Sequence, residues 1–252
     1  YFGTQHRNGT VYALDLHRGR RVWRQRAESP AAAQPAYADG RLYLPTTEDV
    51  QAFAVDDGQP LWRLPLDGAT VQPPIVLDDD VLVAAGDTLL RIGSADGELR
   101  SRTPLPGRPS APLALRGDTV VISMHPGIVA AYVDGGAREV WRHEVDAPVL
   151  AAPVLTDDGV FILTRSATLY RINGRSLQRT AELGGAATES LTITADGALV
   201  GTLDGRLVYL RRDGSTAWEQ KLDGSIRAPA VVHEGDVYAG TLKGRLVKLT
   251  SG

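Results

Sequence analysis

The sequence contains no cysteine, which excludes disulfide bonds and cysteine nucleophiles from this segment and argues against a zinc site. Lysine is scarce as well, because only Lys221, Lys243 and Lys248 contribute to the 27 basic residues. With 30 acidic residues the formal net charge is -3. The chain therefore lacks the basic excess that binding to phosphate backbones requires, and we expect no nucleic-acid partner.

Long apolar runs are missing too. None approaches the roughly 20 residues of a membrane-spanning helix, and no secretory signal opens the chain, so we expect no direct membrane insertion by this segment. The chain starts at Tyr1 within a strand-like run, which suggests a piece of a longer polypeptide. The compartment is not determined by these absences, and of the two alternatives we favour an extracytoplasmic over a cytoplasmic location.

What the sequence does contain is a repeat marked by tryptophan. The second tryptophan follows the first by 39 residues, and the next two follow at 79 and 77 residues, which is close to twice that period. Ser101 and Thr180 occupy the two places where a further tryptophan is expected. A period near 40 residues is typical of propeller blades. The four tryptophans are Trp23, Trp62, Trp141 and Trp218.

Three other runs recur in phase with the tryptophans, and all have β character. A proline-marked run such as QPAYA is followed by a β-branched run such as LYLPT and then by a third run such as VQAFAV. Each is short and is bounded by Asp-Gly, Gly-Asp or Asn-Gly turns. No window shows sustained 3.6-residue periodicity, which excludes a solenoid of helices. The pattern predicts an all-β fold, a β-propeller of four-stranded antiparallel blades.

The number of blades follows from counting the runs. The proline-marked and tryptophan runs each occur six times, whereas the two middle runs occur seven times. The simplest ring therefore has seven blades, of which the first lacks its innermost strand and the last lacks its outermost strand. Eight blades remain the alternative. We expect residues 1–252 to form a single propeller domain.

The repeats resemble the pyrroloquinoline-quinone-like repeat family, whose tryptophan-docking pattern reads Ala-x-Asp-x-x-Thr-Gly-x-x-x-Trp. The first unit matches this pattern at Ala13, Asp15, Gly19 and Trp23, with Arg18 in place of the threonine. The resemblance spans the whole chain and implies the propeller fold. It also implies a structural docking role for all four tryptophans, each with an indole N–H that needs a backbone acceptor.

The quinone-dependent enzymes of this family hold calcium through Glu, Asn and Asp side chains and use an aspartate base. That constellation cannot be mapped onto this chain, whose only asparagines, Asn8 and Asn173, stand next to turn glycines. No nucleophile elbow or phosphate-binding loop occurs either. We therefore expect no catalytic residue, no metal ligand and no cofactor, and hence no enzyme activity in this segment.

Isolated histidines and acidic runs are interpreted as turn residues. The acidic runs, Asp78–Asp80 and Asp157–Asp158, fall between first and second strands, with weak cation binding as the alternative. The histidines lack metal-ligand spacing and are expected in or beside turns. They are His6, His17, His125, His143 and His233.

Recognition is expected at the leading loops, by which we mean the segments that lead into the first strand of each blade. These loops emerge on the same face as the turns between second and third strands, and they are rich in Ala, Pro and Ser. Such a mostly neutral surface suits a protein, a peptide or an unidentified small ligand. Pairing with one another or with water is the alternative for its polar residues. The candidate ligand contacts are Gln72, Arg108, Glu189 and Arg227.

Three functions are compatible with these observations. The first is a non-catalytic recognition or sensor propeller, similar to the propeller domains attached to bacterial serine/threonine protein kinases. The second is a scaffold subunit similar to the propeller lipoprotein of the outer-membrane β-barrel assembly machinery. The third is a degenerate quinone-dependent dehydrogenase, which would have to bind quinone and calcium.

Overall fold

The computed structural model of the chain describes residues 1–5, 9–68, 70 and 72–250. These residues form 26 β-strands and no helix, so they contain no helix able to cross a bilayer. The chain divides into two compact units, each described below by itself. Unit 1 comprises Tyr1–Pro109, Leu115–Val120 and Ala131–Val140, and unit 2 comprises Ser110–Ala114, Val121–Ala130 and Trp141–Gly252.

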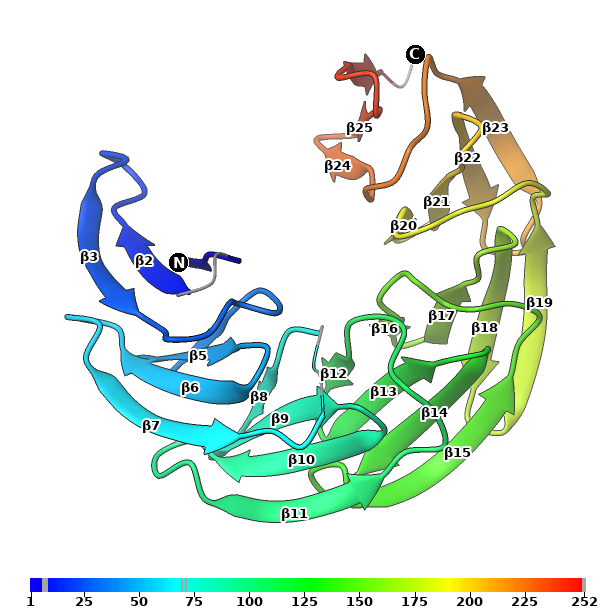
Figure 1. The fold of residues 1–252 in the computed structure, drawn as a ribbon. Coiled ribbons are helices and arrows are strands. Elements are labelled where there is room, and N and C mark those ends of the chain that lie inside the picture. The colour runs from blue at the N-terminus through cyan, green and yellow to red at the C-terminus, as the bar shows by residue number, and fades with distance from the viewer. Residues whose placement is uncertain (6–8, 69, 71, 251–252) are drawn as a thin grey trace. The chain divides into compact units, whose positions relative to one another are not determined.

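Seven antiparallel sheets follow one another along the described residues, and within each sheet the strands are ordered as in the sequence (Figure 1). The first sheet consists of β1 (Phe2–Gly3), β2 (Thr10–Leu14) and β3 (Arg21–Arg26). The second consists of β4 (Ala36–Ala38), β5 (Arg41–Pro45), β6 (Asp49–Ala54) and β7 (Pro60–Pro65). The third consists of β8 (Ile75–Leu77), β9 (Asp80–Ala85), β10 (Thr88–Gly93) and β11 (Leu99–Pro104).

The fourth sheet has residues in both units, and the last three sheets belong to unit 2. The fourth consists of β12 (Ala114–Arg116), β13 (Thr119–Met124), β14 (Ile128–Val133) and β15 (Arg138–Glu144). The fifth consists of β16 (Val154–Thr156), β17 (Gly159–Leu163), β18 (Thr168–Asn173) and β19 (Ser176–Glu182). The sixth consists of β20 (Leu191–Ile193), β21 (Gly197–Gly201), β22 (Arg206–Arg211) and β23 (Thr216–Lys221). The seventh consists of β24 (Val231–His233), β25 (Asp236–Gly240) and β26 (Leu246–Leu249).

The first and last sheets have three strands, and the other five have four. In the first sheet the described strands correspond to the second, third and fourth strands of the repeat, and in the last to the first, second and third. The prediction of seven antiparallel units with an incomplete first and last one is therefore confirmed.

Burial explains the different residue patterns of the strands. Every residue of β9 is buried, so both of its faces are covered and the strand reads as a continuous apolar run. The fourth strand of the same sheet, β11, alternates between half-buried and exposed residues, because one face points to solvent. The sequence pattern thus distinguishes middle strands from outer strands.

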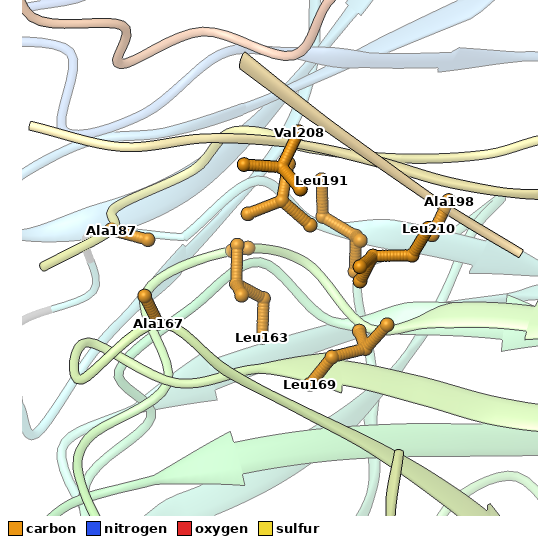
Figure 2. Packing of buried hydrophobic residues seen from close by; sticks show 10 residues of the cluster. Leu163, Ala167, Leu169, Ala187, Leu191, Ala198, Val208 and Leu210 are labelled. Carbon is orange, nitrogen blue, oxygen red and sulfur yellow. The ribbon is translucent and has the colours of Figure 1, made fainter. Parts of the chain in front are cut away.

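The hydrophobic core lies between neighbouring sheets. In unit 2, side chains of the fifth and sixth sheets point toward one another and form one buried cluster (Figure 2). Leu163 and Leu169 come from β17 and β18, and Val208 and Leu210 come from β22. Burying one such leucine is worth about 1.5–3 kcal/mol, so the packing of sheet against sheet is the main source of stability.

A tryptophan fills the space between one sheet and the next at what we call the docking slot, formed by the fourth strand of one sheet and the third-to-fourth turn of the next. Trp23 lies in β3, is 8% exposed, and donates its indole N–H to the carbonyl oxygen of Val55 at 2.6 Å. Gly58 in the turn lies flat against the ring, because a Cβ there would be 2.7 Å from Trp23 Cε3. A second slot repeats this arrangement with Trp62, Ser94 and Gly97.

The third sheet has Ser101 in place of the tryptophan, and an arginine takes over the space. Arg91 of β10 lies against Gly135 and pairs with Asp80 at 2.5 Å. Asp80, which the sequence places in a hairpin turn, is instead the first residue of β9 and is buried. An ion pair therefore occupies the position that an indole occupies in the first two slots.

Trp141 meets a different turn. The fifth sheet joins its third and fourth strands by a two-residue hairpin at Gly174, and nothing lies near this glycine. Trp141 instead contacts the ring of His143 at 5.4 Å, and His143 Nε2 pairs with the Gly174 carbonyl oxygen at 3.1 Å. Within the described residues no acceptor for the Trp141 indole N–H is found. The docking motif is thus modified where the turn is shorter.

Candidate functional site

A pocket of about 460 Å³ opens in unit 1 among the loops on which recognition is expected. Its walls come from the leading loop of the third sheet, the turn between β9 and β10, and the segment that leads to β12. The backbones touch within it, because a Cβ on Gly68 would lie 3.1 Å from the amide nitrogen of Gly86. Its apolar part consists of Ala84, Ala85 and Leu90, all of which are buried.

Two of the four predicted contact residues line this pocket. Gln72 is only 9% exposed, and its side-chain amide has no hydrogen-bond partner among the described residues. Arg108 is exposed and has no carboxylate partner in the described part of the chain. A buried primary amide offers both a donor and an acceptor, and a free guanidinium offers several donors. Such groups can bind the backbone or the carboxylates of a peptide.

Sequence reasoning missed two further charged groups of this pocket. Asp87 follows the glycine of the β9–β10 turn, and no cation pairs with it in the described residues. Asp67 pairs with Arg102 at 2.8 Å across the rim, an exposed ion pair that contributes little stability. Asp87 reads as an ordinary turn residue, and only the three-dimensional structure shows that it lines the same pocket as Gln72 and Arg108.

The other two predicted contacts lie in unit 2. Glu189 and Arg227 are exposed in the leading loops of the sixth and seventh sheets. These two loops touch, because the Thr188 hydroxyl donates to the Arg227 carbonyl oxygen at 3.4 Å. Neither side chain takes part in the pocket formed by Gln72 and Arg108.

Carboxylates anchor the loops around these sites. In the second sheet Asp49 is fully buried, accepts a hydrogen bond from the Thr46 hydroxyl at 2.7 Å, and pairs with Arg63. In the sixth sheet Asp204 accepts a hydrogen bond from Thr202 and pairs with Arg206 at 2.9 Å. Both networks hold the turn between second and third strands, so the loops are presented by a rigid support.

The network around Asp204 predicts a pH effect. The hydrogen bond from Thr202, assisted by Arg206 and Lys221, lowers the pKa of Asp204 below its ordinary value. A lowered pKa in the folded state stabilises the protein above the unfolded pKa of about 3.9, and this contribution disappears as pH falls through the folded pKa. We expect Asp204→Asn to lower the urea midpoint at pH 7 and to match the wild type at about pH 2. An equal difference at both pH values would contradict this assignment.

The described histidines and acidic residues do not gather. Among the residues that the structure describes, no three His, Cys, Asp or Glu side chains lie close enough to hold a metal ion together. His143 lies within β15 rather than in a turn, which corrects the expectation from the sequence. His6 and Asn8 lie outside the described residues.

Solved structures show which class of fold these sheets form. BamB from Moraxella catarrhalis is 17% identical and superposes over 99% of this chain and 91% of its own with a TM-score of 0.68. The computationally designed Ika8 protein is 15% identical, with 99% and 79% covered and a TM-score of 0.80. A europium-containing methanol dehydrogenase is 12% identical, with 97% and 75% covered and a TM-score of 0.74. The fold is a β-propeller with seven blades.

Sequence comparison then identifies the family. A family model described as outer membrane protein assembly factor BamB matches residues 7–136 and 88–251. The chain belongs to this family of pyrroloquinoline-quinone-like repeat propellers, which confirms the resemblance drawn from the tryptophan repeat. No significant match occurs among curated protein sequences.

Proposed function

We propose that this chain is a non-catalytic recognition propeller that binds an extended segment of a partner protein at the pocket lined by Gln72, Arg108 and Asp87. The observation that carries the proposal is that the buried Gln72 amide and both charged groups have no partner within the described chain. A peptide backbone can pair with the amide, and its charged groups can pair with the guanidinium and the carboxylate.

The family match favours a scaffold over a sensor as the biological context. The matching family is described as an outer-membrane assembly factor, so we propose an extracytoplasmic scaffold whose partner is a component of that assembly. A sensor domain of a bacterial serine/threonine kinase remains the alternative, and it uses the same surface. In either role the chain supplies binding and leaves chemistry to its partner.

Site-specific photocrosslinking tests this proposal in the cell of origin. A photoreactive amino acid at position 108 of the full-length protein is expected to give one defined protein adduct. The yield should fall at least about tenfold when Gln72→Ala is added, because the buried amide no longer holds the segment. An outer-membrane assembly protein as the adduct supports the scaffold, and a kinase substrate or regulator supports the sensor.

Matched controls separate binding from folding. The same photoreactive residue at Arg18, an exposed turn position in unit 1, should give no such adduct. Arg108→Ala and Arg227→Ala should leave the unfolding midpoint nearly unchanged, since neither guanidinium has a carboxylate partner within the described residues. An adduct that forms equally at position 18, or that persists with Gln72→Ala, would remove the pocket from the proposal.

A further inference from the structure

The fifth and sixth sheets meet at a docking slot that has no tryptophan. Thr180 of β19 stands where Trp23 stands in the first slot, because the turn glycine of the following sheet, Gly214, packs directly on the Thr180 backbone. Gly58 packs in the same way on the Trp23 ring. The fifth slot therefore keeps the glycine of the docking arrangement and lacks the indole.

A pocket of about 500 Å³ lies at this slot, at the strand ends opposite to the leading loops of these two sheets. Its lining includes Leu169, Arg171 and Ala198, in the same order as Val11, Ala13 and Leu42 around Trp23. Leu169 and Ala198 are labelled in Figure 2. Phe161 and Ile193 add apolar walls. The volume is within the range of small-molecule sites, and the chemistry of the walls is that of an indole-binding slot.

A polar atom inside this pocket has no partner. The Thr180 hydroxyl is buried and makes no hydrogen bond to any described residue. Leaving a buried hydroxyl without a partner costs about 1–3 kcal/mol. In the first two slots the hydrogen-bonding need is that of an indole N–H, which a carbonyl oxygen meets. The Thr180 hydroxyl can accept a hydrogen bond from a ring N–H or donate one to a ring substituent.

Three arginines surround the pocket, and the described residues place no carboxylate in ion-pair contact with them. Arg212 donates twice to the Ala195 carbonyl oxygen, and Arg211 donates to the Thr216 carbonyl oxygen at 3.0 Å. Arg171 donates to the Asp158 carbonyl oxygen at 2.7 Å. All three side chains line the pocket and keep further N–H groups for an anion.

The third sheet shows how the same position is closed when no ligand is needed. Arg91 and Arg171 occupy equivalent third-strand positions in the two sheets that lack the tryptophan. Asp80 holds Arg91 against Gly135 and so fills the third slot. In the fifth sheet Gly159 begins the strand where Asp80 does in the third, so Arg171 lacks this carboxylate. The ion-pair filling is thus present in one slot and missing in the other.

We propose that the pocket at Thr180 binds a planar aromatic ligand that carries a carboxylate. The ring takes the place that the chain's own indole takes in the first two slots, the Thr180 hydroxyl pairs with a polar atom of the ring, and the carboxylate pairs with Arg211 and Arg212. This site is separate from the pocket at Gln72 and stands independently of the function proposed for it.

Calorimetric titration with three probes tests the proposal. Indole-3-acetate carries both features, indole carries the ring alone, and acetate carries the charge alone. We expect indole-3-acetate to bind at least about tenfold more tightly than indole, and acetate to give no heat at about 1 mM. Arg212→Ala should reduce the affinity for indole-3-acetate toward that for indole and leave indole binding unchanged. No binding of indole-3-acetate at about 1 mM, or binding no tighter than acetate, would overturn the proposal.

Filling the slot provides the decisive variant. Thr180→Trp supplies the indole from the chain itself and should abolish binding of indole-3-acetate while the unfolding temperature stays equal or rises. If that variant does not fold, Ala198→Leu narrows the same pocket with the residue that Leu42 provides beside Trp23. Arg108→Ala, in the other unit, is the control and should bind like the wild type. Undiminished binding by a folded slot-filling variant would place the ligand elsewhere and refute the assignment.

Discussion

Trp23→Ala is expected to lower the free energy of unfolding by about 3 kcal/mol or more. The indole is 8% exposed and packs with residues of two sheets, including Val11 of β2 and Leu44 of β5. Its removal leaves a cavity between the sheets and deprives the Val55 carbonyl oxygen of its indole donor. Urea unfolding followed by circular dichroism measures the loss, and a midpoint equal to the wild type would show that the slot does not stabilise the fold.

Trp141→Ala is the matched control for this prediction. Trp141 is half-buried, has no acceptor for its N–H within the described residues, and meets a turn that lacks the packed glycine. We expect a smaller loss than for Trp23→Ala, because less buried area and no hydrogen bond are removed. Equal losses for the two variants would mean that the ring area alone, and not the docking geometry, determines the stability.

The repeat was readable from the sequence because its physical causes are local. A tryptophan at a fixed period, β-branched runs and Asp-Gly turns each act within a few residues, so the strands of all seven sheets could be predicted. The incomplete first and last sheets also follow from counting these runs. Asp80 shows the limit, because a run of three aspartates reads as a turn until the structure places the last one against Arg91.

The candidate sites were only partly predictable, since they depend on contacts between residues far apart in the chain. The leading loops of successive sheets could be named, and Gln72 and Arg108 with them, but sequence does not show that these two side chains share a pocket with Asp87. The pocket at Thr180 was missed for a related reason. The loss of a tryptophan is visible in the sequence, whereas the different fates of the third and fifth slots depend on Asp80 and Gly159 in other strands.

The second large effect is expected for Gly58→Ala, at about 3 kcal/mol. Gly58 has φ of 76°, a left-handed conformation that costs an L-residue about 1–2 kcal/mol. Its added Cβ would lie 2.7 Å from Trp23 Cε3 and would push the indole out of its slot. Gly40 separates the two causes, because its φ is 72° and nothing lies near its Cβ position. Gly40→Ala should therefore show the backbone cost alone.

A double-mutant cycle connects the two large effects. If Gly58→Ala acts by displacing Trp23, the clash disappears once the ring is gone, and in the Trp23→Ala background Gly58→Ala should cost no more than Gly40→Ala. The free energies of the two substitutions then fall short of additivity by about 1–2 kcal/mol, within the usual range for residues in contact. Additive losses would contradict this, because they would mean that the glycine and the indole stabilise the fold independently. The cycle thus tests whether the glycine and the tryptophan of the repeat act as one structural unit that joins neighbouring sheets.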